Sequence, residues 1–308
     1  MVTTDRASIA AGDIARLTLA AICWGLGTVI SKAALAELPP VTLLAVQLLV
    51  SLLVLMALMR VSRIPLRGIV PPLLGRLGLL NPGIAYALSL LGLATITASV
   101  SVLLWALEPL LILVLAVIVL HERLTPFVVL LSAGAVIGIA LVVHDPSRID
   151  AQIVGVGLTL AGIGCCALYT VLTRRSIPDA EETSQVVLVQ QGHGLAVALV
   201  LVVAVSLIGG RIVPSTISAS SVASAVLSGA LYYAGAYWLY LGALRRVPAS
   251  IASATFYLIP IVGVTAGALL LGERLGVSQW VGAAIVLASV LGILARPSTG
   301  VITQPSSG

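Results

Sequence analysis

The chain is poor in charge, in aromatic residues and in cysteine. Of its 308 residues only 9% are charged and 4% aromatic, and three are cysteines. A soluble domain carries charge on about a quarter of its residues, so this composition excludes an ordinary soluble domain. Cys23, Cys165 and Cys166 all fall in long apolar stretches, which argues against a disulfide framework. For the vicinal pair, small buried hydrophobic residues are favoured over a metal or redox site.

The motifs of the common enzyme classes are also missing. His121-Glu122 is followed by Arg123-Leu124-Thr125, without the second histidine of a zinc-protease helix. The sequence has no phosphate-binding P-loop, no glycine-rich dinucleotide turn and no Ser/His/Asp set on convergent segments. We therefore do not expect an enzyme, and we expect no metal, no cofactor and no nucleic-acid partner.

Apolar residues dominate what is present. They make up 60% of the chain, and the mean hydropathy is +1.19. A membrane crossing needs about 20 apolar residues. The sequence predicts an all-α integral membrane protein with ten transmembrane helices, between polar tails at 1–12 and 297–308 that we expect to be unstructured. The ten predicted spans are 14–35, 41–59, 71–92, 97–119, 126–143, 153–173, 183–208, 218–242, 249–271 and 277–295.

The basic residues predict the orientation. With ten spans both termini lie on the same side of the membrane, and basic residues concentrate on the cytoplasmic side. If the termini are cytoplasmic, 12 of the 16 basic residues fall inside and only Lys32, Arg148, Arg211 and Arg274 fall outside. We therefore expect a multi-pass protein of the plasma (inner) membrane with both termini cytoplasmic. The net charge of +5 reports this topology.

Two halves of the chain match each other. Segment 86–124 repeats in 237–275 at an offset of 151 residues, and a second alignment at an offset of 142 joins the openings of the halves. Five spans per half is an odd number, so the second copy must be inverted in the membrane. Such repeats usually enclose a transport path, although a duplication can also simply build a stable bundle. The paired residues are Tyr86 and Tyr237, Ser99 and Ser250, Pro109 and Pro260, Glu122-Arg123-Leu124 and Glu273-Arg274-Leu275, Cys23 and Cys165, Thr28 and Thr170, Lys32 and Arg174, and Gln47 and Gln190.

These features resemble the EamA-type permeases of the drug/metabolite transporter superfamily. The likeness covers roughly residues 14–295 and implies two EamA-like repeats of five helices, at 13–146 and 150–296. It also implies a secondary transporter, most often an exporter of amino acids or related small metabolites. Where many relatives carry arginine in the second span, this chain has Gln47. The motifs that carry the likeness are Ala21-Ile22-Cys23-Trp24-Gly25, Leu107-Glu108-Pro109-Leu110, His121-Glu122-Arg123-Leu124 and Gly272-Glu273-Arg274-Leu275.

Ionisable residues inside the spans are candidates for coupling. Glu108 lies in the fourth span, where a carboxylate costs about 2.5 kcal/mol or more unless it faces a cavity. We expect it to couple proton movement or to recognise an amine; the alternative is a neutral glutamate bonded to carbonyls that Pro109 leaves unpaired. His193, in the seventh span, is the second candidate proton carrier. Its neighbours Gly192 and Gly194 favour close helix packing as the alternative.

Polar and aromatic residues within the spans complete the predicted pathway. Tyrosine offers an apolar face and a hydroxyl, which suits amphipathic solutes, although an interfacial belt also uses it. Pro109 and Pro260 are expected to kink the fourth and ninth spans at equivalent places. Glu122-Arg123 and Glu273-Arg274 are expected to tie helix ends together. The predicted pathway residues are Asn81, Tyr86, Trp105, Glu108, Tyr169, Gln190, His193, Tyr232, Tyr237 and Tyr257.

Three functions fit these observations. The leading one is a secondary active exporter of small metabolites by proton-linked alternating access, acting as a monomer or homodimer in the lipid bilayer. The second is a flippase for a lipid or lipid-linked sugar on the same scaffold. The third is a membrane-embedded enzyme that modifies lipid, against which the missing nucleophile and base count.

Overall fold

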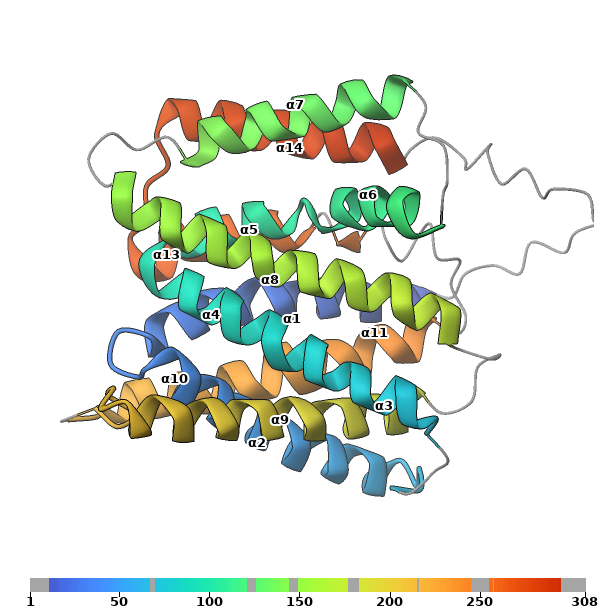
Figure 1. The fold of residues 1–308 in the computed structure, drawn as a ribbon, viewed down its shortest axis with the longest axis vertical. Helices are drawn as coiled ribbons and strands as arrows, with labels where there is room; N and C mark the ends of the chain where they lie inside the picture. Colours follow the sequence, from blue (N-terminus) through green and yellow to red (C-terminus); the bar gives the residue numbers. More distant parts are fainter. Residues whose placement is uncertain are drawn as a thin grey trace, which may run out of the picture.

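The computed structural model describes residues 11–66, 70–120, 126–143, 149–176, 183–214, 216–244, 255–256 and 258–294. Figure 1 shows these residues as helices that run side by side, and none of them forms a β-strand. In the first half the helices are α1 (Ala11–Ala34), α2 (Pro40–Val61), α3 (Pro72–Gly78), η1 (Leu79–Ile84), α4 (Ala85–Thr95), α5 (Ala98–Trp105), α6 (Glu108–Leu120) and α7 (Pro126–Val143). In the second half they are α8 (Ile149–Ser176), α9 (Thr183–Leu207), α10 (Ala219–Ser228), η2 (Gly229–Gly235), α11 (Ala236–Leu244), α13 (Leu258–Leu271) and α14 (Val277–Leu294).

The helices supply ten apolar crossings. Six helical segments are at least 18 residues long and apolar enough to cross a membrane, and four shorter apolar helices lie at Ala98–Ile112, Val129–Val142, Leu258–Leu271 and Val277–Ser289. The predicted all-α membrane fold is thereby confirmed. α3, η1 and α4 together form the third crossing, α5 and α6 the fourth, and α10, η2 and α11 the eighth.

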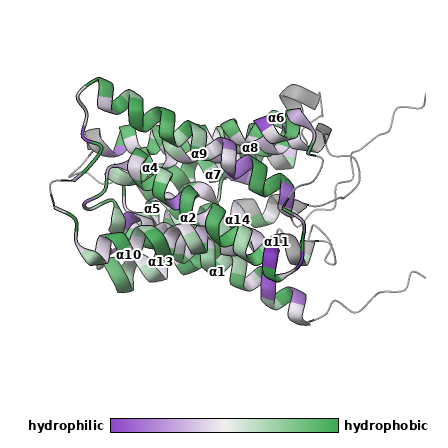
Figure 2. Ribbon diagram, turned by 90° about the horizontal axis from the view of Figure 1, so that it is seen from below, coloured by the Kyte–Doolittle hydropathy of each residue, from purple (hydrophilic) through white to green (hydrophobic). Residues whose placement is uncertain are grey.

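The outside of the helix bundle is apolar and its inside holds polar groups. Leu130 is 68% exposed and Leu269 is 79% exposed, although water would penalise both. In Figure 2 the helices are mostly green, and purple segments lie mainly toward their ends. By contrast Gln47, Ser51 and Gln191 are at most 2% exposed. Lipid is the solvent that suits such a surface.

Packing between the halves follows an inverted repeat. Exchanging the halves turns the contact of α1 with α13 into that of α8 with α6, and both contacts exist. The contact of α2 with η2 likewise becomes that of α9 with η1, and α1 with α11 becomes α8 with α4. The pairs α2 with α9 and α7 with α14 map onto themselves. This pattern is what a twofold axis in the membrane plane produces.

The third and eighth crossings are distorted at the same place. A shift of 151 residues carries η1, at 79–84, onto 230–235, which is six of the seven residues of η2. In η1 the backbone of Asn81 is extended, with φ −139° and ψ 116°, and Pro82 has no N–H to donate. η1 is thus a kink at Asn81-Pro82, whereas η2 is a π-helical turn, and π-helical turns often mark functional sites. The apolar pattern of the sequence predicted uninterrupted spans here and did not show these turns.

Two glycines allow close helix crossings at repeat-related positions. A Cβ on Gly78 would overlap the carbonyl oxygen of Gln190, and one on Gly229 would lie 2.7 Å from the carbonyl oxygen of Gln47. Small residues at such crossings let membrane helices approach closely. The two crossings bring the broken third and eighth helices against α9 and α2.

We expect Gly78→Ala to lower the thermal unfolding temperature of the purified protein. The added methyl group must push α3 away from α9, and overpacking of this kind costs about 1–3 kcal/mol. Gly192→Ala is the matched control, because nothing lies within 4 Å of a Cβ there. Equal unfolding temperatures for the two variants would show that the crossing is not tight.

The fourth crossing breaks next to its proline. α5 ends at Trp105 and α6 begins at Glu108, one residue before Pro109. Glu108 therefore occupies the first turn of α6, where the free N–H groups of a helix favour negative charge. Pro260 is the third residue of α13. Most of the ninth span before it lies outside the described residues, so the kink expected there is not tested.

Candidate functional site

Two cavities lie within the helix bundle. The space not filled by atoms amounts to about 310 Å³ in the first cavity and about 250 Å³ in the second, and part of it is open to the surroundings. The first cavity is lined by Thr28, Ser31, Tyr86, Ser89, Leu90, Leu93, Ser101, Trp105, Tyr232 and Tyr233. The second cavity is lined by Asn81, Pro82, Tyr169, Val187, Gln190, Gln191 and Tyr237.

The cavities lie toward opposite faces of the membrane. Thr28 and Ser31 are near the C-terminal end of α1, which one crossing carries to the first face. Tyr169 is near the C-terminal end of α8, and Gln190 is in the first third of α9. The end of α8 and the start of α9 come after six crossings, whereas the end of α1 comes after one. An even and an odd number of crossings lead to opposite faces of the membrane. Together the cavities therefore span much of the bundle.

The linings of the two cavities are related by the sequence repeat. The 151-residue offset carries Asn81, Pro82 and Tyr86 onto Tyr232, Tyr233 and Tyr237. Asn81 and Pro82 line the second cavity, and their counterparts Tyr232 and Tyr233 line the first. Tyr86 lines the first cavity, and its counterpart Tyr237 lines the second. An inverted repeat exchanges its two faces, so one cavity is the counterpart of the other.

Tyr86 and Tyr237 meet where the cavities adjoin. Their hydroxyl oxygens are 3.3 Å apart, and either hydroxyl can donate to the other. Tyr86 lines the first cavity and Tyr237 the second. Because the repeat makes these two residues equivalent, their contact lies on the pseudo-twofold axis. The tyrosine pair is thus the central partition of the candidate pathway.

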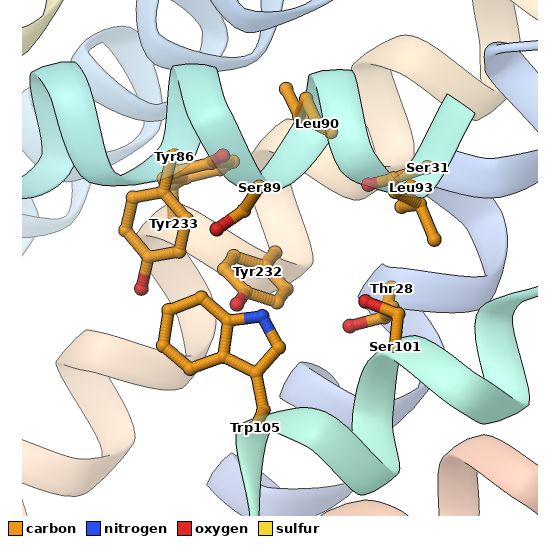
Figure 3. Close-up of a pocket in the computed structure, with 10 residues that line it drawn as sticks. All are labelled: Thr28, Ser31, Tyr86, Ser89, Leu90, Leu93, Ser101, Trp105, Tyr232 and Tyr233. Atoms are coloured by element: carbon orange, nitrogen blue, oxygen red, sulfur yellow. The ribbon is translucent and has the colours of Figure 1, made fainter. Parts of the chain in front are cut away.

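Aromatic rings form one wall of the first cavity. The ring of Tyr86 stacks on Trp105 at a centroid distance of 5.6 Å and an interplanar angle of 22°. Tyr232 and Tyr233 approach Tyr86 edge-on, at 5.5 and 5.1 Å. Figure 3 shows these four rings gathered on one side. Such pairs are worth about 0.5–1.5 kcal/mol each beyond their burial, so the wall is well ordered.

Hydroxyl groups form the other wall of the first cavity. Figure 3 shows Thr28 and Ser101 facing each other on the side away from the rings. Thr28 donates to the carbonyl oxygen of Trp24 at 3.1 Å, and Ser89 donates to that of Ala85 at 2.8 Å. The protons of these hydroxyls are thereby occupied in their own helices. Their oxygens are left to the cavity as acceptors.

Amide side chains dominate the second cavity. Tyr169 donates its hydroxyl to Gln190 Oε1 at 2.8 Å, and Gln190 Nε2 donates to the carbonyl oxygen of Leu74 at 2.8 Å. Gln191 Oε1 accepts from Ser51, and its amide nitrogen donates to a carbonyl oxygen of the eighth crossing. These bonds join α9 to α2, α3, α8 and η2, and so fix the shape of this cavity.

A chain of hydrogen bonds runs from the second cavity to Glu108. Asn81 Nδ2 donates to the sulfur of Cys166 at 3.3 Å, and the Cys166 thiol donates to Glu108 Oε1 at 3.1 Å. The three residues come from η1, α8 and α6. All three cysteines are free thiols, and Cys166 is more than the small hydrophobic residue that we expected from the sequence. Nothing in the sequence places these three residues together, because each lies on a different span.

Polar ties join helix ends at the face next to the first cavity, and those of Glu273 also join the two halves. Glu273 accepts from the backbone N–H groups of Ala98 and Ser99 at 2.7 and 2.9 Å, and from the Ser99 hydroxyl at 2.6 Å. Lys32 donates to the carbonyl oxygen of Leu93 at 2.8 Å, near the end of α4. The expectation that Glu273 ties helix ends together is confirmed. Glu122-Arg123 lies outside the described residues.

A second carboxylate clamp lies at the same face. Glu37 accepts from the backbone N–H of Ser218 at 2.7 Å and from its hydroxyl at 2.8 Å. The backbone bond, and then the hydroxyl bond, lower the pKa of the Glu37 carboxyl below its usual value. Because this pKa is lowered by folding, the clamp stabilises the fold fully at pH values above the pKa of Glu37 in the unfolded chain. The stabilisation is lost as the pH falls through the lower pKa of Glu37 in the folded protein.

We expect Glu273→Ala to loosen this face. The change removes three hydrogen bonds from the start of α5, and losing a helix cap costs about 0.5–2 kcal/mol. A cysteine at Ser101, in the first cavity, should then react about 5–30-fold faster with an impermeant maleimide. Gln279→Ala is the control, since it removes a bond between α14 and α7 away from both cavities. Equal rates in Glu273→Ala and the parent would contradict the clamp.

Most of the predicted pathway residues line a cavity. Asn81, Tyr169, Gln190 and Tyr237 line the second cavity, and Tyr86, Trp105 and Tyr232 line the first. Glu108 lines neither cavity and is joined to Asn81 through the thiol of Cys166.

One further predicted residue that the structure describes, His193, lines neither cavity. His193 is half-buried on α9, its Nδ1 is 2.9 Å from the carbonyl oxygen of Val189 in its own helix, and it faces Gly75. Tyr257 lies outside the described residues. The sequence analysis missed the small hydroxyl residues of the first cavity, although Thr28 and Ser31 are spaced three apart on one helix face. Gln191, next to the predicted Gln190 in the seventh span, also lines the second cavity.

Ten apolar crossings, an inverted repeat and two facing cavities define a membrane transport protein. The profile of the EamA-like transporter family matches residues 14–144 and 153–295. The chain belongs to the EamA-like transporter family, as the resemblance predicted. Among curated proteins no sequence matches. A solved structure titled "Crystal structure of protein" is similar over 91% of this chain and 96% of that one, with a TM-score of 0.60 and 19% identity, which supports the fold alone.

Proposed function

We propose that the protein is a secondary active exporter of small amphipathic metabolites, with amino acids and related compounds as candidate cargo. It works in the plasma membrane by alternating access, with both termini cytoplasmic. The orientation rests on the placement of 12 of the 16 basic residues at one face. The first cavity then opens to the outside and the second to the cytoplasm.

The observation that carries this proposal is the pair of repeat-related cavities that meet at Tyr86 and Tyr237. Two inverted units can rock about such a contact and open each cavity in turn. The near-symmetry of the halves keeps the two open states similar in energy. A packed bundle without a transport role has no need of cavities on both sides of its axis.

Glu108 is the proposed coupling group. It is a partly buried carboxylate at the start of α6, joined through Cys166 to Asn81 in the second cavity. Intramembrane carboxylates in such places commonly carry protons or bind cations. Cargo that binds next to Asn81 is therefore coupled to the Glu108 carboxylate through two hydrogen bonds, from Asn81 to Cys166 and from Cys166 to Glu108. Exchange of a proton for cargo at this place would drive export.

Transport by the purified protein in proteoliposomes tests the proposal. A mixture of labelled amino acids and amines is loaded, and an imposed pH gradient should drive release at a rate above that of protein-free vesicles. Tyr237→Ala with intact folding should slow that release. Movement of headgroup-labelled lipid without release of any solute would contradict the proposal and would indicate a flippase.

A further inference from the structure

We propose that Asn81 Oδ1 is the receptor for a protonated amine in the second cavity, so that the cargo is a small organic amine. This inference rests on the transporter function proposed above and names its substrate class. It is carried by an unpartnered acceptor on a residue that lines the second cavity, by the hydrogen bonds that orient it, and by the absence of basic side chains among the described residues of the lining.

Asn81 presents an acceptor that the protein does not use. It is the only asparagine of the chain, it is 5% exposed, and it lines the second cavity. Its Oδ1 is buried and has no hydrogen-bond partner within the described part of the chain. A buried carbonyl without a partner costs stability. A ligand that donates an N–H to this oxygen removes that cost when it binds.

Cys166 determines which end of the Asn81 amide is left without a partner. A thiol has one proton, and this proton goes to Glu108 Oε1. The sulfur is then left as an acceptor, so it takes an N–H from Asn81 and the Nδ2 end of the amide must face it. Oδ1 is thereby turned away from Cys166. Cys166 is a positioning residue in this arrangement.

The fold itself does not require polar groups at this place. The repeat carries Asn81, Cys166 and Glu108 onto Tyr232, Trp24 and Ile259. These three counterparts pack in a single apolar cluster on the other side of the pseudo-twofold axis. One half thus fills the position with hydrocarbon and aromatic rings, whereas the other keeps an amide, a thiol and a carboxylate. The polar version is therefore a candidate for specificity rather than for folding.

The other groups along the pathway also suit a cation. No arginine, lysine or histidine is among the residues that line the two cavities in the described part of the chain. The first cavity offers the faces of Trp105 and Tyr86, which attract an ammonium group. The hydroxyl oxygens of Thr28 and Ser89 add acceptors. A carboxylate would find no basic partner among the described residues of either lining.

Binding of three matched probes to the purified full-length protein tests the inference. Phenethylamine, phenylalanine and 3-phenylpropionate share a phenyl ring on a short chain and carry an ammonium, a zwitterion and a carboxylate. Isothermal titration without a gradient should rank them in that order, with phenethylamine at least about tenfold tighter than 3-phenylpropionate. Equal affinities, tighter binding of 3-phenylpropionate, or no binding of phenethylamine would overturn the inference.

Variants assign the preference to Asn81. Asn81→Leu should reduce the preference for phenethylamine over 3-phenylpropionate to less than about threefold, whereas Asn81→Asp, which keeps the shape and an acceptor, should retain it. Thr159→Val is the matched control, because Thr159 Oγ1 is also buried without a partner among the described residues but lines neither cavity. If Asn81→Leu does not fold, Cys166→Val provides the same readout. A preference that persists in the folded variant of Asn81 or Cys166 would overturn the inference.

Transport of labelled phenethylamine in proteoliposomes separates this inference from the proposed function. Probe preference in the titrations without any transport would contradict the proposed function and leave the amine site standing. Transport of phenylalanine and 3-phenylpropionate as fast as phenethylamine would contradict the amine site and leave the exporter standing. Preferential transport of phenethylamine would support both.

Discussion

Glu108→Gln is expected to abolish accumulation of cargo driven by a pH gradient and to leave counterflow intact. The amide has the shape of the carboxylate and can still accept from Cys166, but it cannot take up a proton. With one proton exchanged per cargo, a gradient of one pH unit supports about tenfold accumulation, and the variant should show none. Counterflow needs only cargo binding and movement of the two halves, so it should continue.

The control for this prediction is Cys166→Ser. A serine hydroxyl can still donate to Glu108 and accept from Asn81, so driven accumulation should remain. Glu108 would be removed from the mechanism if Glu108→Gln accumulated cargo as the parent does. Loss of both accumulation and counterflow would indicate a structural role for the carboxylate.

Tyr86→Ala is expected to weaken cargo binding about 10–100-fold without lowering the yield of folded protein. The change removes a ring that contacts Trp105, Tyr232 and Tyr233, and it opens the partition at Tyr237. The cargo would lose the aromatic ring that Tyr86 contributes to the lining of the first cavity, and a loss of about 1.4–2.8 kcal/mol of binding free energy corresponds to a 10–100-fold weaker affinity. Titration of phenethylamine into the purified variant measures the effect.

Two variants make the test of Tyr86 specific. Tyr86→Phe keeps the ring and loses only the hydroxyl contact with Tyr237, so affinity should fall less than about fivefold. Trp280→Ala removes an aromatic side chain that is 57% exposed on α14, and should leave cargo affinity unchanged. A low yield of folded Tyr86→Ala would instead assign the ring to packing.

The repeat in the sequence predicted more of this structure than its composition did. The 151-residue offset paired Tyr86 with Tyr237 before any contact was known, and their hydroxyls are 3.3 Å apart. The same offset aligns Gly78 with Gly229, and these glycines make close crossings with the backbones of Gln190 and Gln47 in the matching seventh and second spans. Structural symmetry of this kind can be predicted from a sequence because equivalent residues recur at a fixed offset.

What breaks the symmetry could not be predicted. Asn81, Cys166 and Glu108 lie on three different spans. Their counterparts Tyr232, Trp24 and Ile259 contain no amide, thiol or carboxylate. A single sequence contains no signal that brings such residues together, because their contacts depend on how the helices rotate and break. The breaks at η1 and between α5 and α6 were equally hidden, since proline alone does not say how a helix accommodates it.

Reciprocal access to the two cavities tests the central claim most directly. Single cysteines at Ser101 and at Val187 report on the first and second cavity, in a background where the native cysteines are serine. Impermeant maleimide is applied from each face, with and without phenethylamine and with the pH gradient in either direction. The account predicts that every condition that speeds labelling at one position slows it at the other. Labelling that rises or falls together at both positions, or is absent at both, would contradict it.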